Sequence, residues 1–330
     1  CKQRTYEPEP KEKCCNVEER VERYLKAKLR AEEMADYLIF EDVEQWEVNT
    51  PKSRGVKLRD CGSYLEFRNY YTHPQNPTLL NYANFCKQHL ICPLCAIRRS
   101  AKMLGAYMPK VLSLIEEGYK PMMVTLTVRN GEDLLERFNH LRLGAQLLMY
   151  RGQQYHKRGQ NAETQARFQY GAVGSYEMKK GKNSGLWHPH IHMIWMCRPD
   201  RLPDKYLLSQ EWEEITEDSK IIDIRPIDYV PGHDLDCDYE GDLDGLISGL
   251  VEVFKYPMKF GQMTPKENWY CFNTLKGRNL IASWGKFRKI KVPESYLDKP
   301  LLDKDLPYLK MIYRYRDTSY TLRKVENCQK

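Results

Sequence analysis

Three histidines alternate along one short apolar segment, at His188, His190 and His192. Residues 186–196 have the composition of a β-strand, and alternate residues of a strand lie on one face. We therefore expect the three rings to point the same way, and Pro189 restricts this part of the strand to an early or edge position. Two imidazoles about 7 Å apart on one face can converge on a single ion. Because three of the chain's eight histidines fall within five residues, we predict a metal site here.

A carboxylate on a neighbouring strand is the expected third ligand. Residues 171–179 predict a strand, joined to the histidine strand by a turn at 181–185 that begins and ends with glycine. If this hairpin turns near residue 183, Glu177 lies beside His190 and His192. Two histidines and a carboxylate with open coordination positions suit Mn²⁺, Mg²⁺ or Zn²⁺ acting on a phosphate. The alternative is that Glu177 is an ordinary solvent-facing residue.

A tyrosine in a later helix is a candidate nucleophile. Residues 241–256 predict a helix that Pro257 ends, and Glu252 and Tyr256 lie four residues apart on one face of it. Lys259, just after the proline, can reach the same region. A tyrosine beside a carboxylate and a metal can attack a phosphodiester. The chain has 23 tyrosines, so the sequence by itself leaves a surface role for Tyr256 open.

Clustered cysteines predict a second metal site. Cys86, Cys92 and Cys95 lie close together, and the Cys-x-x-Cys spacing of the last two lets both thiolates bind one tetrahedral ion. Cys61 and His89 compete as the fourth ligand. The alternative is that these are free buried cysteines, which pack as small apolar side chains. Eleven cysteines in all, with no signal peptide, indicate a reducing compartment and metal binding in preference to disulfides.

Three motifs then occur in order along the chain. They are Thr125-Leu126-Thr127 on a predicted strand, His190-Ile191-His192, and Glu252 followed by Lys255-Tyr256-Pro257 in a helix. This ordered set resembles the motifs of rolling-circle replication initiator (Rep) proteins of small bacterial plasmids, in the HUH endonuclease superfamily. The resemblance covers about residues 57–295. With Glu252 one turn before Tyr256 and Phe260 one turn after it, the chain resembles the single-tyrosine type.

The resemblance implies a fold and a mechanism. The fold is α+β, with a central antiparallel sheet that has a ferredoxin-like HUH core, helices packed on it, the histidine strand in its middle and a zinc-binding module N-terminal to the core. Tyr256 would nick one DNA strand at a plasmid double-strand origin, form a 5′-phosphotyrosine link and leave a free 3′-hydroxyl. After strand transfer, Glu252 would activate the water that ends the last cleavage, with Lys259 in the same catalytic group.

The resemblance also implies ligands and partners. His190, His192 and Glu177 would hold a catalytic Mn²⁺ or Mg²⁺, while His188 is an additional histidine without an assigned role. Cys61 is favoured as the fourth Zn²⁺ ligand, because the family has a Cys-Gly or Cys-Ala pair at this place. The expected partners are DNA, as an origin hairpin that is single-stranded at the nick, and a host helicase and polymerase. A homodimer stays open. We expect a bacterial cytoplasmic protein without a membrane partner.

The elements that must position these motifs follow from periodicity and composition. Helices are predicted at 16–37, 101–118, 132–158, 205–217 and 241–256, and strands at 122–128, 171–179, 186–196 and 220–227. A loop is expected around Pro51 and Gly55. The order β-α-β-β-α-β-α from residue 122 onward predicts an antiparallel sheet with helices on one side.

We predict four successive segments along the chain. They are an N-terminal tail and helix (1–55), a zinc-binding module (56–105), an HUH nicking domain (106–295) and a C-terminal extension (296–330).

The charge distribution suits a polyanionic partner. The net charge is +7, but residues 201–250 hold four Lys or Arg against 14 Asp or Glu, and residues 251–330 hold 17 against eight. Residues 81–110 carry five basic side chains and no acidic one, and a second basic stretch lies at 286–291. Arg98, Arg99 and the second stretch are expected to contact phosphates.

Two other functions remain compatible with the sequence. One is an HUH transposase or relaxase, although such transposases usually have paired tyrosines. The other is a non-catalytic, zinc-containing DNA-binding repressor, which would need neither the histidine pair nor the Glu252 and Tyr256 pair. The origin of such an initiator, in a plasmid or a phage, also stays open.

Overall fold

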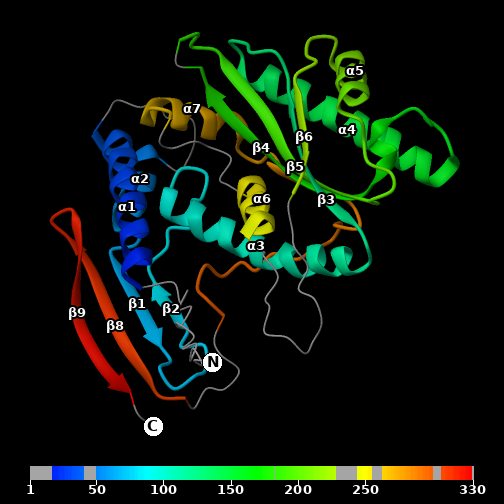
Figure 1. The fold of residues 1–330 in the computed structure, drawn as a ribbon. Helices are drawn as coiled ribbons and strands as arrows, with labels where there is room; N and C mark the ends of the chain where they lie inside the picture. The colour runs from blue at the N-terminus through cyan, green and yellow to red at the C-terminus, as the bar shows by residue number, and fades with distance from the viewer. Residues whose placement is uncertain are drawn as a thin grey trace, which may run out of the picture. The chain divides into compact units, whose positions relative to one another are not determined.

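The structure is a computed structural model that describes residues 17–40, 50–181, 183–227, 244–254, 262–299 and 306–328. The chain divides into two compact units, one of residues 1–86 with 297–330 and the other of residues 87–296. Both units combine helices with an antiparallel sheet, so the predicted α+β class agrees with the structure (Figure 1). The four-segment division stays a prediction. By contacts, its first and last segments belong to the same unit.

The first unit is built on a four-stranded sheet with the order β2-β1-β8-β9. Its elements are α1 (Val17–Phe40), α2 (Pro51–Asp60), β1 (Tyr64–Asn69), β2 (Thr78–Ala83), β8 (Tyr308–Arg316) and β9 (Ser319–Cys328). The predicted loop around Pro51 is wrong, because these residues form α2. The Thr50 side chain caps that helix and Pro51 occupies its first turn, where a missing N–H costs no helical hydrogen bond.

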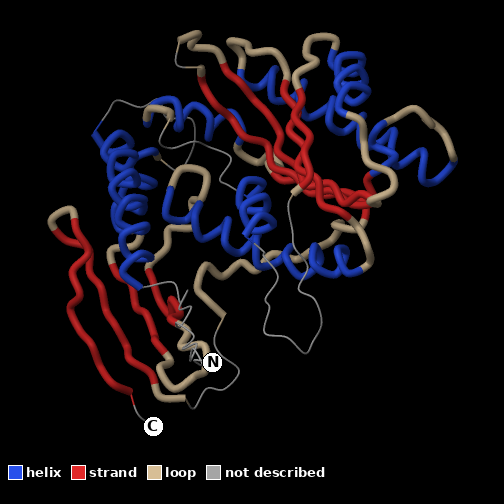
Figure 2. The backbone as a smooth tube through the Cα atoms, viewed as in Figure 1, coloured by secondary structure: helices blue, strands red, loops and turns tan. Residues whose placement is uncertain are grey.

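The second unit carries the predicted histidine strand. Its elements are α3 (Pro93–Glu116), β3 (Lys120–Thr127), α4 (Leu134–Arg158), the 3₁₀ helix η1 (Gln165–Phe168), β4 (Gln169–Lys180), β5 (Trp187–Cys197), α5 (Lys205–Thr216), β6 (Ile222–Pro226), α6 (Asp244–Phe254), α7 (Pro265–Leu275) and β7 (Ile281–Gly285). The strand order is β6-β3-β5-β4-β7, so β5 lies in the middle of the sheet (Figure 2).

Helices cover both faces of this second sheet, and the expectation of helices on one side is wrong. In Figure 1, α4 and α5 lie on one face and α3 and α6 on the other. The reason is visible in β5, whose residues are buried at both parities. One face packs Val173 and Ile194 against α3 and α6, while Tyr176, of opposite parity to Val173, meets Phe138 of α4 in an edge contact on the other. A sheet that is apolar on both faces needs a helical layer on each.

Among the described residues, no helix is both long and apolar enough to cross a membrane.

Candidate metal centre

The sheet register brings the three histidines to one face. In β5, His190 pairs with Glu177 of β4, and His192 pairs with Thr125 of β3. The ring centroids of His188 and His190 are 5.5 Å apart, and those of His190 and His192 are 4.7 Å apart. Pairing with β3 ends at His190, so Pro189 occupies an early position in β5 where its missing N–H breaks no ladder with β3.

Glu177, His190 and His192 together form a set of converging donor atoms. One carboxylate oxygen of Glu177 lies 3.0 Å from His190 Nε2, and the other lies 3.9 Å from His192 Nε2. One ligand atom from each of the three residues lies within 4.8 Å of the others. Atoms that share one ion at about 2.1 Å each are separated by about 3 to 3.5 Å, so only small movements bring this set onto a single ion.

Hydrogen bonds to the far side of each ring orient the Nε2 atoms. Thr125 Oγ1 lies 2.9 Å from His192 Nδ1, and the backbone oxygen of His188 lies 3.4 Å from His190 Nδ1. Such partners fix the tautomer and direction of a metal-binding imidazole. His188 itself points its Nδ1 at Asn130 Oδ1, 2.5 Å away, and is not part of the donor set.

The electrostatics of the site favour the ligand form of His192. Burial, with a further contribution from the neighbouring His190, lowers the pKa of His192 to about 4. Burial and His190 also lower the pKa of His188. Neutral imidazole is the form that binds metal, and a buried carboxylate supplies negative charge for a divalent ion. The residues present therefore fit a divalent cation held by one carboxylate and two imidazoles, with coordination positions left open.

Helix α6 brings the predicted catalytic carboxylate to this site. Glu252 Oε1 lies 3.9 Å from His192 Nε2. The last turn of α6 is tied to β4 because the Ser175 hydroxyl donates a hydrogen bond to the backbone oxygen of Val253. Leu250 and Phe254 are buried in the core on this face. Tyr256 and Lys259 lie outside the described residues.

Sequence reasoning missed several residues around the donor set. Ser175 anchors α6, Asn130 holds the ring of His188, and the ammonium of Lys179 lies 3.2 Å from Glu177 Oε1. A signal for two of them was present, since Ser175 and Lys179 alternate with Glu177 along one strand and must share its face. Nothing in the sequence pattern points to Asn130, which follows a different strand.

The four predicted zinc ligands also come together. The sulfur atoms of Cys61, Cys86, Cys92 and Cys95 all lie within 4.8 Å of one another, and the Cys86 N–H donates to Cys61 Sγ at 3.4 Å. His89 is not in the group, and its Nδ1 lies 3.3 Å from the hydroxyl of Tyr296. Four sulfur donors at this spacing suit a closed tetrahedral site.

The expected phosphate contact of Arg98 does not agree with the structure. Its side chain is buried, and its Nε donates a hydrogen bond to the backbone oxygen of Tyr296 at 2.6 Å. The first turns of α3 are packed inward, so the basic character of the segment does not place each cation at the surface.

Comparison with known proteins establishes the family. The family model described as "Replication protein" matches residues 78–307, which is more than half of the chain. The chain belongs to this Rep family of replication proteins. The predicted resemblance to plasmid replication initiators is therefore confirmed at the level of the family. The match includes all three residues of the Glu177, His190 and His192 set.

Three proteins named "Protein rep" are similar over most of their length. One from Bacillus sp is 29% identical over 262 residues, covering 72% of this chain and 79% of its own. One from Bacillus amyloliquefaciens is 28% identical and covers 72% of each chain. One from Streptococcus pneumoniae serotype 2 is 27% identical, covering 71% of this chain and 70% of its own. No solved structure gives a significant match.

Proposed function

We propose that this replication initiator nicks one strand of DNA at a plasmid double-strand origin, through a covalent link to Tyr256. The observation that carries the proposal is the convergence of Glu177, His190 and His192, whose ligand atoms lie within 4.8 Å of one another. The carboxylate of Glu252 in α6 lies 3.9 Å from the Nε2 atom of His192. A carboxylate and two imidazoles form an open site for a divalent ion, and a DNA-binding repressor would need no such site. We also propose that the sheet carrying this site is an HUH core with ferredoxin-like topology.

Each residue has a part in the proposed nicking step. Mn²⁺ or Mg²⁺ held by Glu177, His190 and His192 would supply Lewis-acid polarisation of the scissile phosphate. The oxygen of Tyr256 attacks phosphorus and loses its proton, while the bond to the 3′ oxygen breaks and that oxygen gains a proton. The result is a 5′-phosphotyrosine link and a free 3′-hydroxyl. Lys259, close to Tyr256 in the sequence, is proposed to act in the same group.

Glu252 has its role at the end of the cycle. After strand transfer, a second cleavage is proposed to end in hydrolysis, with Glu252 accepting the proton of the attacking water. Its carboxylate comes from the described part of α6 and is half-buried beside the donor set. A host helicase and polymerase are the proposed partners for strand separation and synthesis.

The four-cysteine cluster is proposed to bind a structural Zn²⁺. Its ligands are all sulfur, and such closed sites contribute to folding and leave no position for a substrate. Protein purified without chelator should contain one zinc per chain by elemental analysis. A value near zero in folded protein would remove this assignment.

The nicking proposal is tested with a labelled single-stranded origin oligonucleotide and Mn²⁺ on a denaturing gel. A covalent band that requires both metal and Tyr256 is expected, with Tyr256→Phe binding the oligonucleotide but giving no band. Glu252→Ala should accumulate the band, because hydrolysis is slowed. An adduct that survives in Tyr256→Phe would refute the assignment of the nucleophile. Tight origin binding without any cleavage would favour the repressor.

A further inference from the structure

Three adjoining cavities follow the edge strand β7 in the second unit. Their volumes are about 300, 580 and 730 Å³. The first and second share Arg278 and Ile281 in their walls, and the second and third share Gln146 and Trp284. The shared wall residues place the three cavities side by side along β7, the first against α3 and α6 and the other two against α4. We call the three together the β7 groove.

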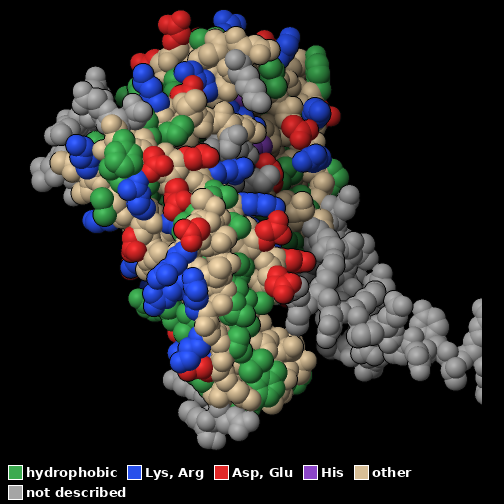
Figure 3. Space-filling view, turned by 90° about the vertical axis from the view of Figure 1, so that its left-hand side faces the viewer, with side chains coloured by type: hydrophobic (Ala, Val, Ile, Leu, Met, Phe, Trp, Pro, Cys, Tyr) green, Lys and Arg blue, Asp and Glu red, His purple; other side chains and the backbone are tan. Residues whose placement is uncertain are grey.

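The walls of the β7 groove carry one sign of charge. Among the described residues that line it there is no Asp or Glu, although 45 of the chain's 330 residues are acidic. Four of its basic residues form no ion pair within the described part of the chain, namely Arg142, Lys157, Arg278 and Arg288. On the face shown in Figure 3, by contrast, Lys and Arg are interspersed with Asp and Glu.

A neighbouring cavity shows that this charge pattern is not general. The cavity between η1 and α5, of about 680 Å³, is lined by Arg151 together with Glu211 and Glu214. Arg151 lies 3.5 Å from Glu211 and 2.8 Å from Glu214, so its charge is already neutralised within the protein. The cations of the β7 groove are not neutralised in this way and remain available to a polyanion.

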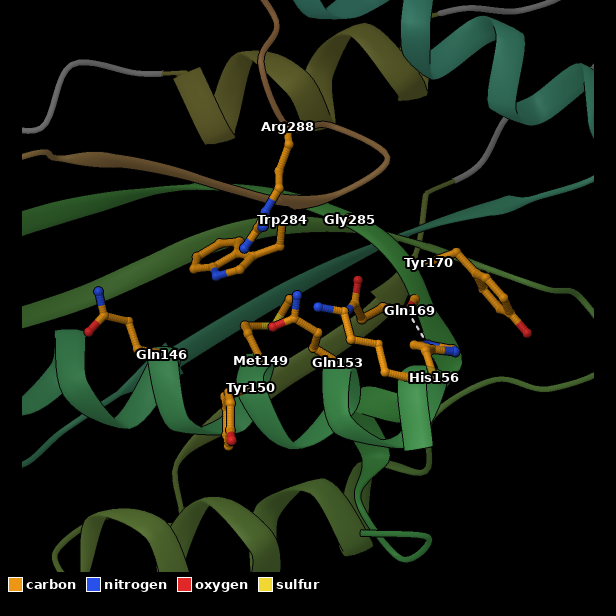
Figure 4. A pocket seen from close by; sticks show the side chains of 11 residues that line it. Gln146, Met149, Tyr150, Gln153, His156, Gln169, Tyr170, Trp284, Gly285 and Arg288 are labelled. Atoms are coloured by element: carbon orange, nitrogen blue, oxygen red, sulfur yellow. Dashed lines mark hydrogen bonds between the residues drawn. The ribbon is translucent and has the colours of Figure 1, made fainter. Parts of the chain in front are cut away.

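Aromatic and amide side chains complete the groove. Figure 4 shows Arg288 extending from the chain after β7 toward Trp284, whose ring is half-buried. Tyr176 and Gln169 also line the groove and are almost fully buried. The Tyr176 hydroxyl and the Gln169 side-chain oxygen have no hydrogen-bond partner within the described residues. A half-buried indole beside a cation can stack with an unpaired base while the cation binds its phosphate.

One end of the groove lies near the metal centre. Its first cavity is lined by Phe254, the last described residue of α6, and by Ile281. Ile281 pairs with Ser175, and Ser175 pairs with His192. From this end the groove follows β7 to Trp284, whose parity differs from that of Ile281 and which therefore faces α4. The groove thus runs from the nicking face around the open edge of the sheet.

We propose that the β7 groove binds single-stranded DNA, as the continuation of the strand whose phosphate lies at the metal centre. The proposal rests on the proposed function for the direction of the strand. Backbone phosphates would pair with Arg278, Arg288 and Lys157, and one base would stack on Trp284. A duplex is the wrong ligand, because its bases are already stacked and cannot reach an indole inside a groove.

The test measures binding of a labelled oligo(dT) by fluorescence anisotropy, without added divalent metal. Arg288→Gln and Trp284→Leu should each weaken binding at least about 5-fold, and Trp284→Phe, which keeps an aromatic ring, should restore most of it. Arg288→Gln should also lower the slope of log affinity against log salt by about 0.7, the value for one phosphate contact on a single strand. Arg151→Gln is the matched control and should bind as the unaltered chain does.

The outcomes separate this inference from the nicking proposal. If Arg288→Gln binds oligo(dT) as tightly as the unaltered chain, or if Arg288→Gln and Arg151→Gln lose equal affinity, the proposal that the groove binds DNA is wrong. Equal affinity for a blunt duplex, with the same loss in Arg288→Gln, would also overturn it. Arg288 is exposed, so its variant remains informative if Trp284→Leu fails to fold. Groove-dependent oligo(dT) binding in a protein that forms no Tyr256 adduct would refute nicking and leave the groove standing.

Discussion

The two candidate metal clusters differ in donor type, number and surroundings. The cysteine cluster has four sulfur donors, which complete a tetrahedral ion, and three of its cysteines are buried. The Glu177, His190 and His192 set has three donors, and its neighbours include the carboxylate of Glu252. A closed sulfur site stabilises a fold, whereas a three-ligand site keeps a position for substrate. The comparison teaches that the chain keeps a closed set of four sulfur donors apart from an open set of one carboxylate and two imidazoles.

Replacing a cysteine ligand should have the largest effect. Cys92→Ser removes one of four thiolates, and because structural zinc binding contributes directly to folding, we expect a loss on the order of 5 kcal/mol in the free energy of unfolding. Thermal denaturation and zinc content measure it together. Cys328→Ser, outside the cluster, should leave both unchanged. A Cys92→Ser protein with unchanged zinc content and unchanged melting temperature would show that Cys92 is an ordinary buried cysteine and not a zinc ligand.

Thiol modification sharpens the comparison between ligand and non-ligand cysteines. Burial raises the pKa of Cys197 and of Cys271 to about 12, from an ordinary value of 9.0. Below pH 9 each therefore holds about 1000-fold less thiolate than an ordinary cysteine, and alkylation should be slower by about that factor. With a chelator at pH 8, which releases the metal from the cluster, mass spectrometry should find Cys92 and Cys95 alkylated before Cys197 and Cys271. Early alkylation of Cys271 in folded protein would contradict this.

Loss of a histidine ligand should affect catalysis and spare the fold. His190→Ala removes a donor of the open site, and we expect nicking to fall by more than about 100-fold, beyond the effect typical of residues that only orient a ligand. Zinc content and melting temperature should stay as they are. His188→Ala is the matched control, because His188 shares the face but not the donor set. Equal losses in the two variants would assign the effect to the strand as a whole.

The smallest effect is expected from the residue that orients His192. Thr125→Val keeps the shape of the side chain and removes the hydroxyl that lies 2.9 Å from His192 Nδ1. We expect Mn²⁺ to bind about 10-fold more weakly, so that nicking needs an about 10-fold higher Mn²⁺ concentration to reach half of its maximal rate. Thr127→Val is the control, because the Thr127 hydroxyl donates to the backbone oxygen of Ile221 and not to a histidine. The same rise in the Mn²⁺ requirement in Thr127→Val would show that the loss of any hydroxyl from β3 has this effect.

Local periodicity predicted most of the second unit. The strands β3, β4, β5 and β6 and the helices α4 and α5 lie within a few residues of their predicted positions, because each has a distinct apolar period. The short strands β1, β2 and β7 were not predicted. Nor was the pairing of β1 with β8, which joins residues about 245 positions apart in sequence. No local pattern specifies which distant strand completes an edge.

The sequence by itself determined which side chains could share a strand face and which helix carried Glu252, because both follow from fixed backbone periods. It also determined the family, through the order and spacing of the motifs. The expected turn near residue 183 already placed Glu177 beside His190, and the two residues pair in the sheet. Only the tertiary structure decided that Glu252 of α6 lies beside His192 and that the described residues lining the β7 groove include no acidic ones. These depend on strand register and on contacts between elements far apart in the chain, which arise when apolar surfaces on both faces of the sheet are buried together.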